Sequence, residues 1–261
     1  PYWVSYSSMV EFAGAKPILV LAGIEQDFKV TPEQLEAHIT PKTKLMMFSS
    51  PCNPSGSIYS KAELQAIAQM LEKYPQIYII SDEIYEHINY IGKHESIAQF
   101  ENLRDRVIVI NGVSKGYAMT GWRLGYIAAP FPVAAACEKI QGQFTSGTSS
   151  ISQRAAIAAL TKSLAPTHAM RDTFKKRRDL VLDMMKNIDG FKCNVPPGAF
   201  YVFPDVSSYF GKTDGKQTIS DAMDLSMYIL EHAHVTTVTG EAFGSPDNLR
   251  LSYAASEADL T

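Results

Sequence analysis

The sequence predicts an α/β protein, with a mainly parallel mixed sheet flanked by helices and a smaller α+β domain at the C-terminal end. Short apolar runs alternate with amphipathic helical patterns over about the first half of the chain. This alternation predicts a parallel sheet, because parallel strands need long crossover connections that are usually helices. After about residue 130, a long helical stretch and shorter strand-like runs replace the alternation. We therefore expect a large domain over residues 1–175 and a small one over 176–261.

Composition places the chain among ordinary globular proteins. Of its 261 residues, 46% are hydrophobic and 20% are charged, which can build a sizeable core and argues against disorder. The formal net charge is -3, so no overall basic field predicts binding to nucleic acid or anionic membranes. No apolar run approaches the ~18 residues that a membrane-spanning helix needs.

The cysteines indicate a reducing compartment. Cys52, Cys137 and Cys193 are odd in number and far apart, which fits reduced thiols better than disulfides or a zinc site. We expect a cytoplasmic protein. No metal site is expected either, since His232 and His234 have no third ligand near them in the sequence.

The elements of the large domain follow from periodicity and capping signals. Five apolar runs have strand length: residues 18–21, 45–48, 77–81, 107–111 and 125–129. Residues 60–74 carry their apolar side chains on one helical face, and Ser60 with Glu63 predicts a capping box at the start of that helix. Residues 31–34 repeat this capping-box pattern from Thr31 to Gln34, and Pro32 supports a helix start there because proline is favoured at the first helical position.

The small domain has its own set of predicted elements. A helix is expected from about residue 166 to 187, and another from about 220 to 232. Shorter strand candidates lie at residues 191–195, 199–203, 235–239 and 249–253.

The stretch at residues 112–125 is the most informative for chemistry. Lys115 comes directly after a predicted buried strand, at the start of a glycine-rich loop. Lysine is rarely buried without a partner, and a buried amine suits Schiff-base chemistry with an aldehyde. Arg123, eight residues later, offers a planar fork of donors that suits a phosphate. Alone, these two residues fit a surface loop equally well.

Two further strand ends carry polar side chains. Asp82 ends a predicted strand, where ligands bind in open α/β sheets, and could hold a protonated ring nitrogen. Tyr85 offers a phenol three residues on, and Asn53 follows another strand in an Asn-Pro turn. Together with Lys115 and Arg123, these groups match the needs of pyridoxal 5'-phosphate, which takes a lysine Schiff base and an acidic partner for its ring nitrogen.

The chain resembles the fold-type I, class I aminotransferases that depend on pyridoxal phosphate, and most of all the bacterial branch of aspartate aminotransferases. The segment from Gly112 to Gly125 matches the cofactor-attachment signature of that family at every constrained position. Other family-like segments are residues 1–6, 53–56, 81–87, 198–201 and 250–254.

The resemblance implies a role for each matching residue. Lys115 forms the Schiff base with the cofactor and moves the proton, while Asp82 pairs with the pyridine nitrogen. The implied partners of the phenolic oxygen are Asn53 and Tyr85, and those of the phosphate are Arg123 and Ser114. Trp3 stacks on the ring, and Arg250 grips the substrate carboxylate, near which Phe200, Trp3 and Asn53 line the substrate side of the site.

The chain also departs from the family pattern. Gly112 lacks the hydroxyl that some members use on the phosphate. The N-terminal portion of the family, which includes a glycine-rich phosphate turn, has no counterpart, so we expect this sequence to be part of a longer protein.

The implied activity is transamination between an L-amino acid, with aspartate favoured, and the 2-oxo acid 2-oxoglutarate, by a homodimer. Two alternatives stay open from the sequence. One is a different reaction on the same cofactor, such as an aromatic or other transaminase or a β-lyase. The other is the aminotransferase-like sensor domain of a transcription regulator.

Overall fold

The computed structural model describes residues 1–261, which form two compact units. The unit called here the sheet unit comprises Thr31–Pro51 and Tyr59–Arg171. The C-terminal unit comprises Pro1–Val30, Cys52–Ile58 and Asp172–Thr261. No helix in the structure is both long and apolar enough to cross a membrane. The domain boundary at residue 175 stays a prediction.

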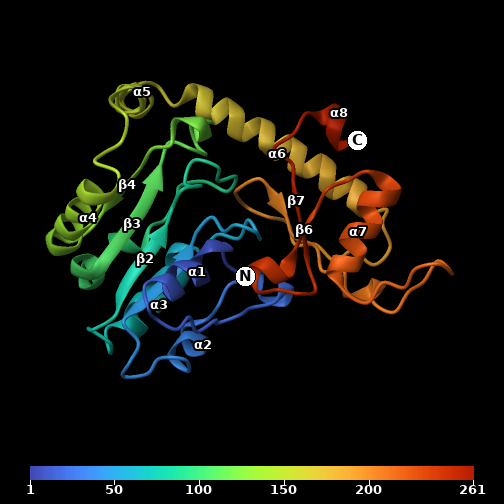
Figure 1. Cartoon of the computed structure of the whole chain (residues 1–261), viewed down its shortest axis with the longest axis horizontal. Coiled ribbons are helices and arrows are strands. Elements are labelled where there is room, and N and C mark those ends of the chain that lie inside the picture. Colours follow the sequence, from blue (N-terminus) through green and yellow to red (C-terminus); the bar gives the residue numbers. More distant parts are fainter. The chain divides into compact units, whose positions relative to one another are not determined.

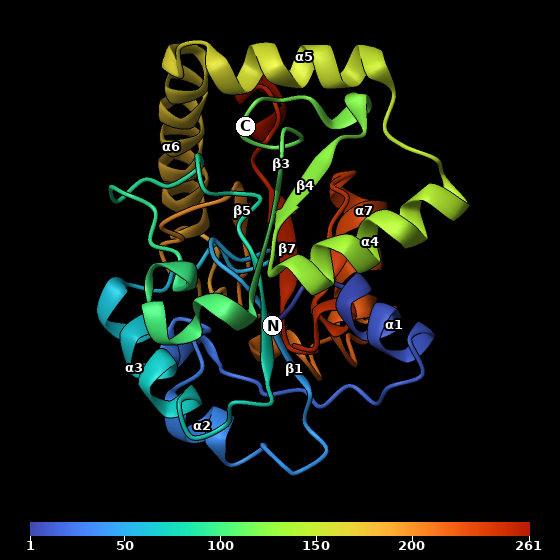
Figure 2. The same ribbon diagram turned by 90° about the vertical axis from the view of Figure 1, so that its left-hand side faces the viewer.

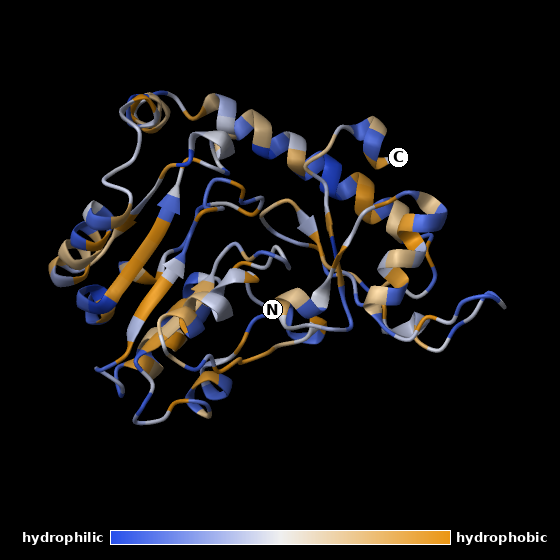
Figure 3. Ribbon diagram, in the orientation of Figure 1, coloured by the Kyte–Doolittle hydropathy of each residue, from blue (hydrophilic) through white to orange (hydrophobic).

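The sheet unit contains a four-stranded sheet in the order β1-β2-β3-β4 (Figure 1 and Figure 2). The strands are β1 (Leu45–Ser49), β2 (Tyr78–Asp82), β3 (Val107–Gly112) and β4 (Gly125–Ala128). The first three strands are parallel, and β4 runs antiparallel to β3. The strands are largely hydrophobic, as coverage by helices requires (Figure 3). The predicted α/β class with a mainly parallel mixed sheet is confirmed.

Both predicted capping boxes are present in the sheet unit. The helices of this unit are α2 (Pro32–Glu36), α3 (Lys61–Leu71), α4 (Phe131–Phe144), α5 (Ser150–Thr161) and the first turns of α6 (Ala165–Met185), with short 3-10 helices η2 (Ile97–Gln99), η3 (Glu101–Arg106) and η4 (Thr120–Trp122). The side chain of Ser60 accepts from the backbone N–H of Glu63, and Thr31 does the same for Gln34. The buried face of α3 contributes Leu64, Ile67 and Leu71 to the core.

A buried arginine completes the C-terminal end of α3. Arg106 is only 9% exposed, and its guanidinium donates to the carbonyl oxygens of Leu71 at 2.7 Å, Tyr74 at 2.7 Å and Ile77 at 3.1 Å. The Leu71 and Tyr74 carbonyls each also accept one backbone N–H, so the guanidinium adds a second, charged donor and stabilises the connection from α3 to β2.

We expect Arg106→Met to lower the free energy of unfolding by about 2–4 kcal/mol, because buried carbonyls lose charged donors. Urea unfolding would measure the loss, with Arg104→Met as the matched control because Arg104 is exposed. Equal stabilities of the two variants would contradict this role for Arg106.

The C-terminal unit contains a three-stranded antiparallel sheet in the order β5-β7-β6. Its strands are β5 (Tyr201–Val202), β6 (Val238–Thr239) and β7 (Leu249–Ser252), and its helices are α1 (Ser5–Phe12), η1 (Ile24–Gln26), the rest of α6, η5 (Ser207–Tyr209), α7 (Ala222–Ala233), η6 (Gly240–Phe243) and α8 (Glu257–Leu260). Leu225 of α7 packs with Leu249 of β7 in one core cluster. Phe28, Phe203 and Phe243 form another.

Two predicted strands are wrong. Residues 18–21 form no strand, and Ile18, Leu19 and Leu21 remain 44–58% exposed, because no neighbouring strand pairs with them. Residues 191–195 contribute only an isolated bridge between Lys192 and Asp205. The two prolines that follow at 196 and 197 lack the N–H donors that would extend the ladder.

Candidate active site

The sheet unit brings four predicted site residues to one edge of its sheet. Asp82 is the last residue of β2 and Tyr85 follows three residues later, while Ser114 and Lys115 follow the end of β3 by two and three residues. Since β2 and β3 are parallel neighbours, with Asp82 beside Ile110, their carboxyl ends lie together. Ligands bind at this edge of open α/β sheets.

The amine of Lys115 lies beside the phenol ring of Tyr85. Lys115 Nζ is 5.9 Å from the ring centroid, and Tyr85 is only 3% exposed. One carboxylate oxygen of Asp82 accepts from the backbone N–H of Ile84 at 3.1 Å, which fixes the side chain at the end of the strand. A nucleophilic amine, a phenol and a carboxylate therefore share this edge.

Two glycines explain how the chain around Lys115 packs. A Cβ atom on Gly112 would lie 2.9 Å from both Gly125 Cα and the Leu124 carbonyl oxygen, so a side chain with a hydroxyl does not fit there. Gly112 is thus required by the close pairing of β3 with β4. On Gly116, a Cβ atom would lie 2.9 Å from the ring of His87, which packs against the backbone next to Lys115.

Arg123 lies at the end of the loop that begins at Lys115. It adopts the left-handed conformation with φ of 50°, and its Nη1 donates to the Thr120 carbonyl oxygen at 3.0 Å. The side chain is exposed. Its guanidinium offers further donors for an anion such as a phosphate.

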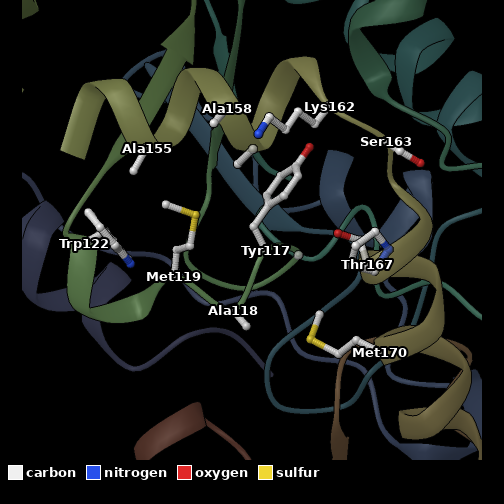
Figure 4. Close-up of a pocket in the computed structure, with 13 residues that line it drawn as sticks. Tyr117, Ala118, Met119, Trp122, Ala155, Ala158, Lys162, Ser163, Thr167 and Met170 are labelled. Carbon is white, nitrogen blue, oxygen red and sulfur yellow. The ribbon is translucent and has the colours of Figure 1, made fainter. Parts of the chain in front are cut away.

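A cavity of about 530 Å³ adjoins the same loop (Figure 4). Gly116, Tyr117 and Trp122 line it from the loop, and Lys162 and Thr167 line it from the end of α5 and the start of α6. Burial raises the pKa of Tyr117, and the nearby Glu86 carboxylate adds to that rise, so the phenol is protonated at neutral pH. The residues contributed by α5 and α6 could not be predicted from the sequence, because only the fold brings them to the loop.

The C-terminal unit contains the other four predicted residues, Trp3, Asn53, Phe200 and Arg250. Arg250 Nη1 donates to Asn53 Oδ1 at 2.8 Å. The guanidinium also lies over two aromatic rings, 4.6 Å from the Tyr201 centroid and 4.8 Å from that of Phe243. Its Nε is buried without a hydrogen-bond partner. An arginine held in this way can bind a carboxylate by donating two parallel hydrogen bonds to it.

Aromatic packing fixes the remaining two residues of this unit. Trp3 meets Tyr6 of α1 edge to face, with ring centroids 5.6 Å apart. Phe200 lies between Phe174 of α6, at 5.3 Å, and Tyr201, at 4.8 Å.

Comparison with known proteins identifies the family. The family model "Aminotransferase class I and II" matches residues 1–261. An aspartate/prephenate aminotransferase of Cereibacter sphaeroides is 46% identical over 263 residues, and a bifunctional aspartate aminotransferase and glutamate/aspartate-prephenate aminotransferase of Petunia hybrida is 46% identical over 265 residues. Both alignments include 100% of this chain, which spans 66% of the bacterial protein and 55% of the plant protein.

The solved structures agree with this result. The crystal structure of the aspartate aminotransferase from Rhizobium meliloti matches 100% of this chain with a TM-score of 0.96 and 42% identity, and the match covers 66% of that structure. An aromatic aminotransferase from Pyrococcus horikoshii matches with a TM-score of 0.92 and 34% identity. The chain belongs to the class I and II aminotransferase family.

Proposed function

We propose that the protein transfers amino groups between an L-amino acid, with aspartate favoured, and a 2-oxo acid such as 2-oxoglutarate, with pyridoxal 5'-phosphate as its cofactor. The observation that carries the proposal is the Lys115 amine beside Tyr85, at the sheet edge where Asp82 ends β2. Family membership and relatives named aspartate aminotransferase support it.

The residues of the sheet unit fit this cofactor by their chemistry. Lys115 supplies the amine that an aldehyde needs, and Asp82 the carboxylate that a protonated ring nitrogen needs. Tyr85 supplies a phenol for the ring oxygen, and Arg123 with Ser114 supplies donors for the phosphate. In the C-terminal unit, the proposal assigns Trp3 to stacking on the ring and Asn53 to the ring oxygen.

When bound, pyridoxal phosphate supplies an aldehyde that condenses with amines and a ring that takes up the electrons left when a substrate proton is removed. Lys115 Nζ accepts the α-proton of the amino acid as general base and later donates it again. The Asp82 carboxylate would favour the protonated form of the cofactor's ring nitrogen, because opposite charge stabilises the charged form. The phenol of Tyr85 donates a hydrogen bond that stabilises a neighbouring oxyanion.

Arg250 is the residue proposed to bind the substrate. Its guanidinium grips the α-carboxylate, and Asn53 and the rings of Tyr201 and Phe243 hold it in place. Phe200 is proposed to line the substrate side of the pocket.

A panel assay of the full-length protein tests the activity and separates it from the alternatives. The protein is loaded with pyridoxal phosphate, and oxo-acid formation is followed for aspartate, aromatic amino acids and other amino acids, with 2-oxoglutarate as acceptor. The proposal is supported if oxo-acid formation is faster from aspartate, which gives oxaloacetate, than from the other amino acids. Pyruvate with ammonia would indicate a β-lyase, and cofactor binding without turnover would favour a sensor domain.

Prephenate belongs in the same panel as a second amino acceptor. Five of the relatives that match 100% of this chain carry prephenate in their names: two aspartate/prephenate aminotransferases, two probable aspartate/prephenate aminotransferases and one bifunctional enzyme. Amino transfer from aspartate or glutamate to prephenate would extend the proposal to that oxo acid.

We also propose a homodimer in the cytoplasm. Apolar side chains of α4, such as Phe131 and Phe144, are each 84% exposed, which is typical of a surface that another element or subunit covers. All three cysteines are free thiols, as a reducing compartment favours. Light scattering on the full-length protein would give the oligomeric state.

A further inference from the structure

Glu83, next to Asp82, is a buried carboxylate that the proposed mechanism does not use. Its residue exposure is only 4%. Its Oε1 accepts hydrogen bonds from Ser81 Oγ at 2.9 Å and Ser96 Oγ at 2.6 Å, and its Oε2 accepts from His94 Nε2 at 2.8 Å. Leaving a carboxylate this deep without donors would be costly, so the three partners stabilise it.

The donors come from two separate segments of the sheet unit. Ser81 belongs to β2, whereas His94 and Ser96 lie in the segment directly before η2. Because a carboxylate only accepts, His94 carries a hydrogen on Nε2, and its other ring nitrogen is buried without a partner. The Glu86 carboxylate lies nearby, with one oxygen within 4.8 Å of atoms of Glu83 and His94. The side chain of Glu83 thus ties the end of β2 to residues 94–96.

The backbone of Glu83 is fixed as well. Its N–H donates to the Ile110 carbonyl oxygen of β3 at 2.9 Å, and its carbonyl accepts from the Glu86 N–H at 2.9 Å. The latter bond closes the turn that carries Tyr85. The side chain, the N–H and the carbonyl of Glu83 are therefore all hydrogen-bonded. In the sequence Glu83 lies between Asp82 and Tyr85, which are assigned above to the ring nitrogen and the ring oxygen.

We propose that Glu83 is a positioning residue, whose hydrogen bonds to Ser81, His94 and Ser96 hold Asp82 and Tyr85 in place for the cofactor ring. This inference rests on the proposed function, because it concerns how the same site is built. It predicts that loss of the carboxylate disturbs the cofactor site in protein that is still folded. A purely structural role would lower only stability.

The test compares Glu83→Ala and Glu83→Gln in the full-length protein with Glu95→Gln. Glu95 is the matched control, because it lies between His94 and Ser96 and its Oε2 accepts a hydrogen bond from the Gln99 side chain, at 2.9 Å. Below the melting temperature of every variant, absorbance titrations give the Kd for pyridoxal phosphate and the pH midpoint of the bound cofactor's absorption band.

For Glu83→Ala we expect the Kd to rise about tenfold to a hundredfold, the effect of losing hydrogen bonds to charged groups. The pH midpoint should also rise, because a displaced Tyr85 no longer stabilises the ring oxyanion. Glu83→Gln should recover most of both values, since its amide oxygen still accepts. Glu95→Gln should match the unmodified protein.

Unchanged Kd and pH midpoint in Glu83→Ala, together with a lower melting temperature, would overturn the positioning role. If that variant does not fold, Ser81→Ala removes one donor with less disturbance, and an unchanged Kd there would overturn the role equally. Failure of the unmodified protein to bind pyridoxal phosphate would instead refute the proposed function, and the positioning role with it.

Discussion

Lys115→Ala is expected to lower kcat for aspartate transamination by more than about a thousandfold, because it removes both the nucleophilic amine and the general base. The fold should survive. Lys115 packs beside Tyr85 in a half-buried position, and shortening it to alanine leaves the strands on either side unchanged. A coupled oxaloacetate assay measures the rate, and thermal unfolding checks the fold.

Lys61→Ala is the matched control for this change, since Lys61 is an exposed lysine at the start of α3. Its kcat should equal that of the unmodified protein. Turnover retained by folded Lys115→Ala would refute the role assigned to this lysine.

Arg250→Gln is expected to lower kcat/KM for aspartate about a hundredfold or more, because the half-buried charged donor to the substrate carboxylate is lost. Much of the effect should appear as a higher KM. The kcat/KM of Arg250→Lys should lie between those of Arg250→Gln and the unmodified protein. Lysine keeps the charge but lacks the planar fork that Asn53, Tyr201 and Phe243 hold.

Arg104→Gln serves as the control, because Arg104 is exposed. Steady-state kinetics at saturating 2-oxoglutarate separate KM from kcat. An unchanged kcat/KM in Arg250→Gln would show that another residue binds the carboxylate.

Local sequence signals predicted much of the fold. Four of the five expected strands of the large sheet formed, and both capping boxes closed as Ser60 and Thr31 indicated. The failure at residues 18–21 has a clear physical reason. A strand needs a partner to satisfy its backbone, and apolar composition alone does not show whether one is available.

The candidate site was predictable only in part. Residues at or just after the ends of strands, such as Asp82 and Lys115, could be proposed as site residues because ligands bind at the carboxyl edge of a parallel sheet. Glu83 could not, because the serine and histidine donors that allow its burial come from a segment more than ten residues away. The sequence also could not show why position 112 is a glycine, since only the pairing of β3 with β4 reveals that a side chain there would clash.

The central claim is that the amine of Lys115 condenses with the aldehyde of pyridoxal phosphate. Borohydride reduction of the cofactor-loaded, full-length protein turns such a Schiff base into a stable secondary amine, which peptide mass spectrometry can locate. We predict the added pyridoxyl phosphate mass on the peptide that contains Lys115, and its loss in Lys115→Ala. A modification found on a different lysine, or on none, would contradict the claim.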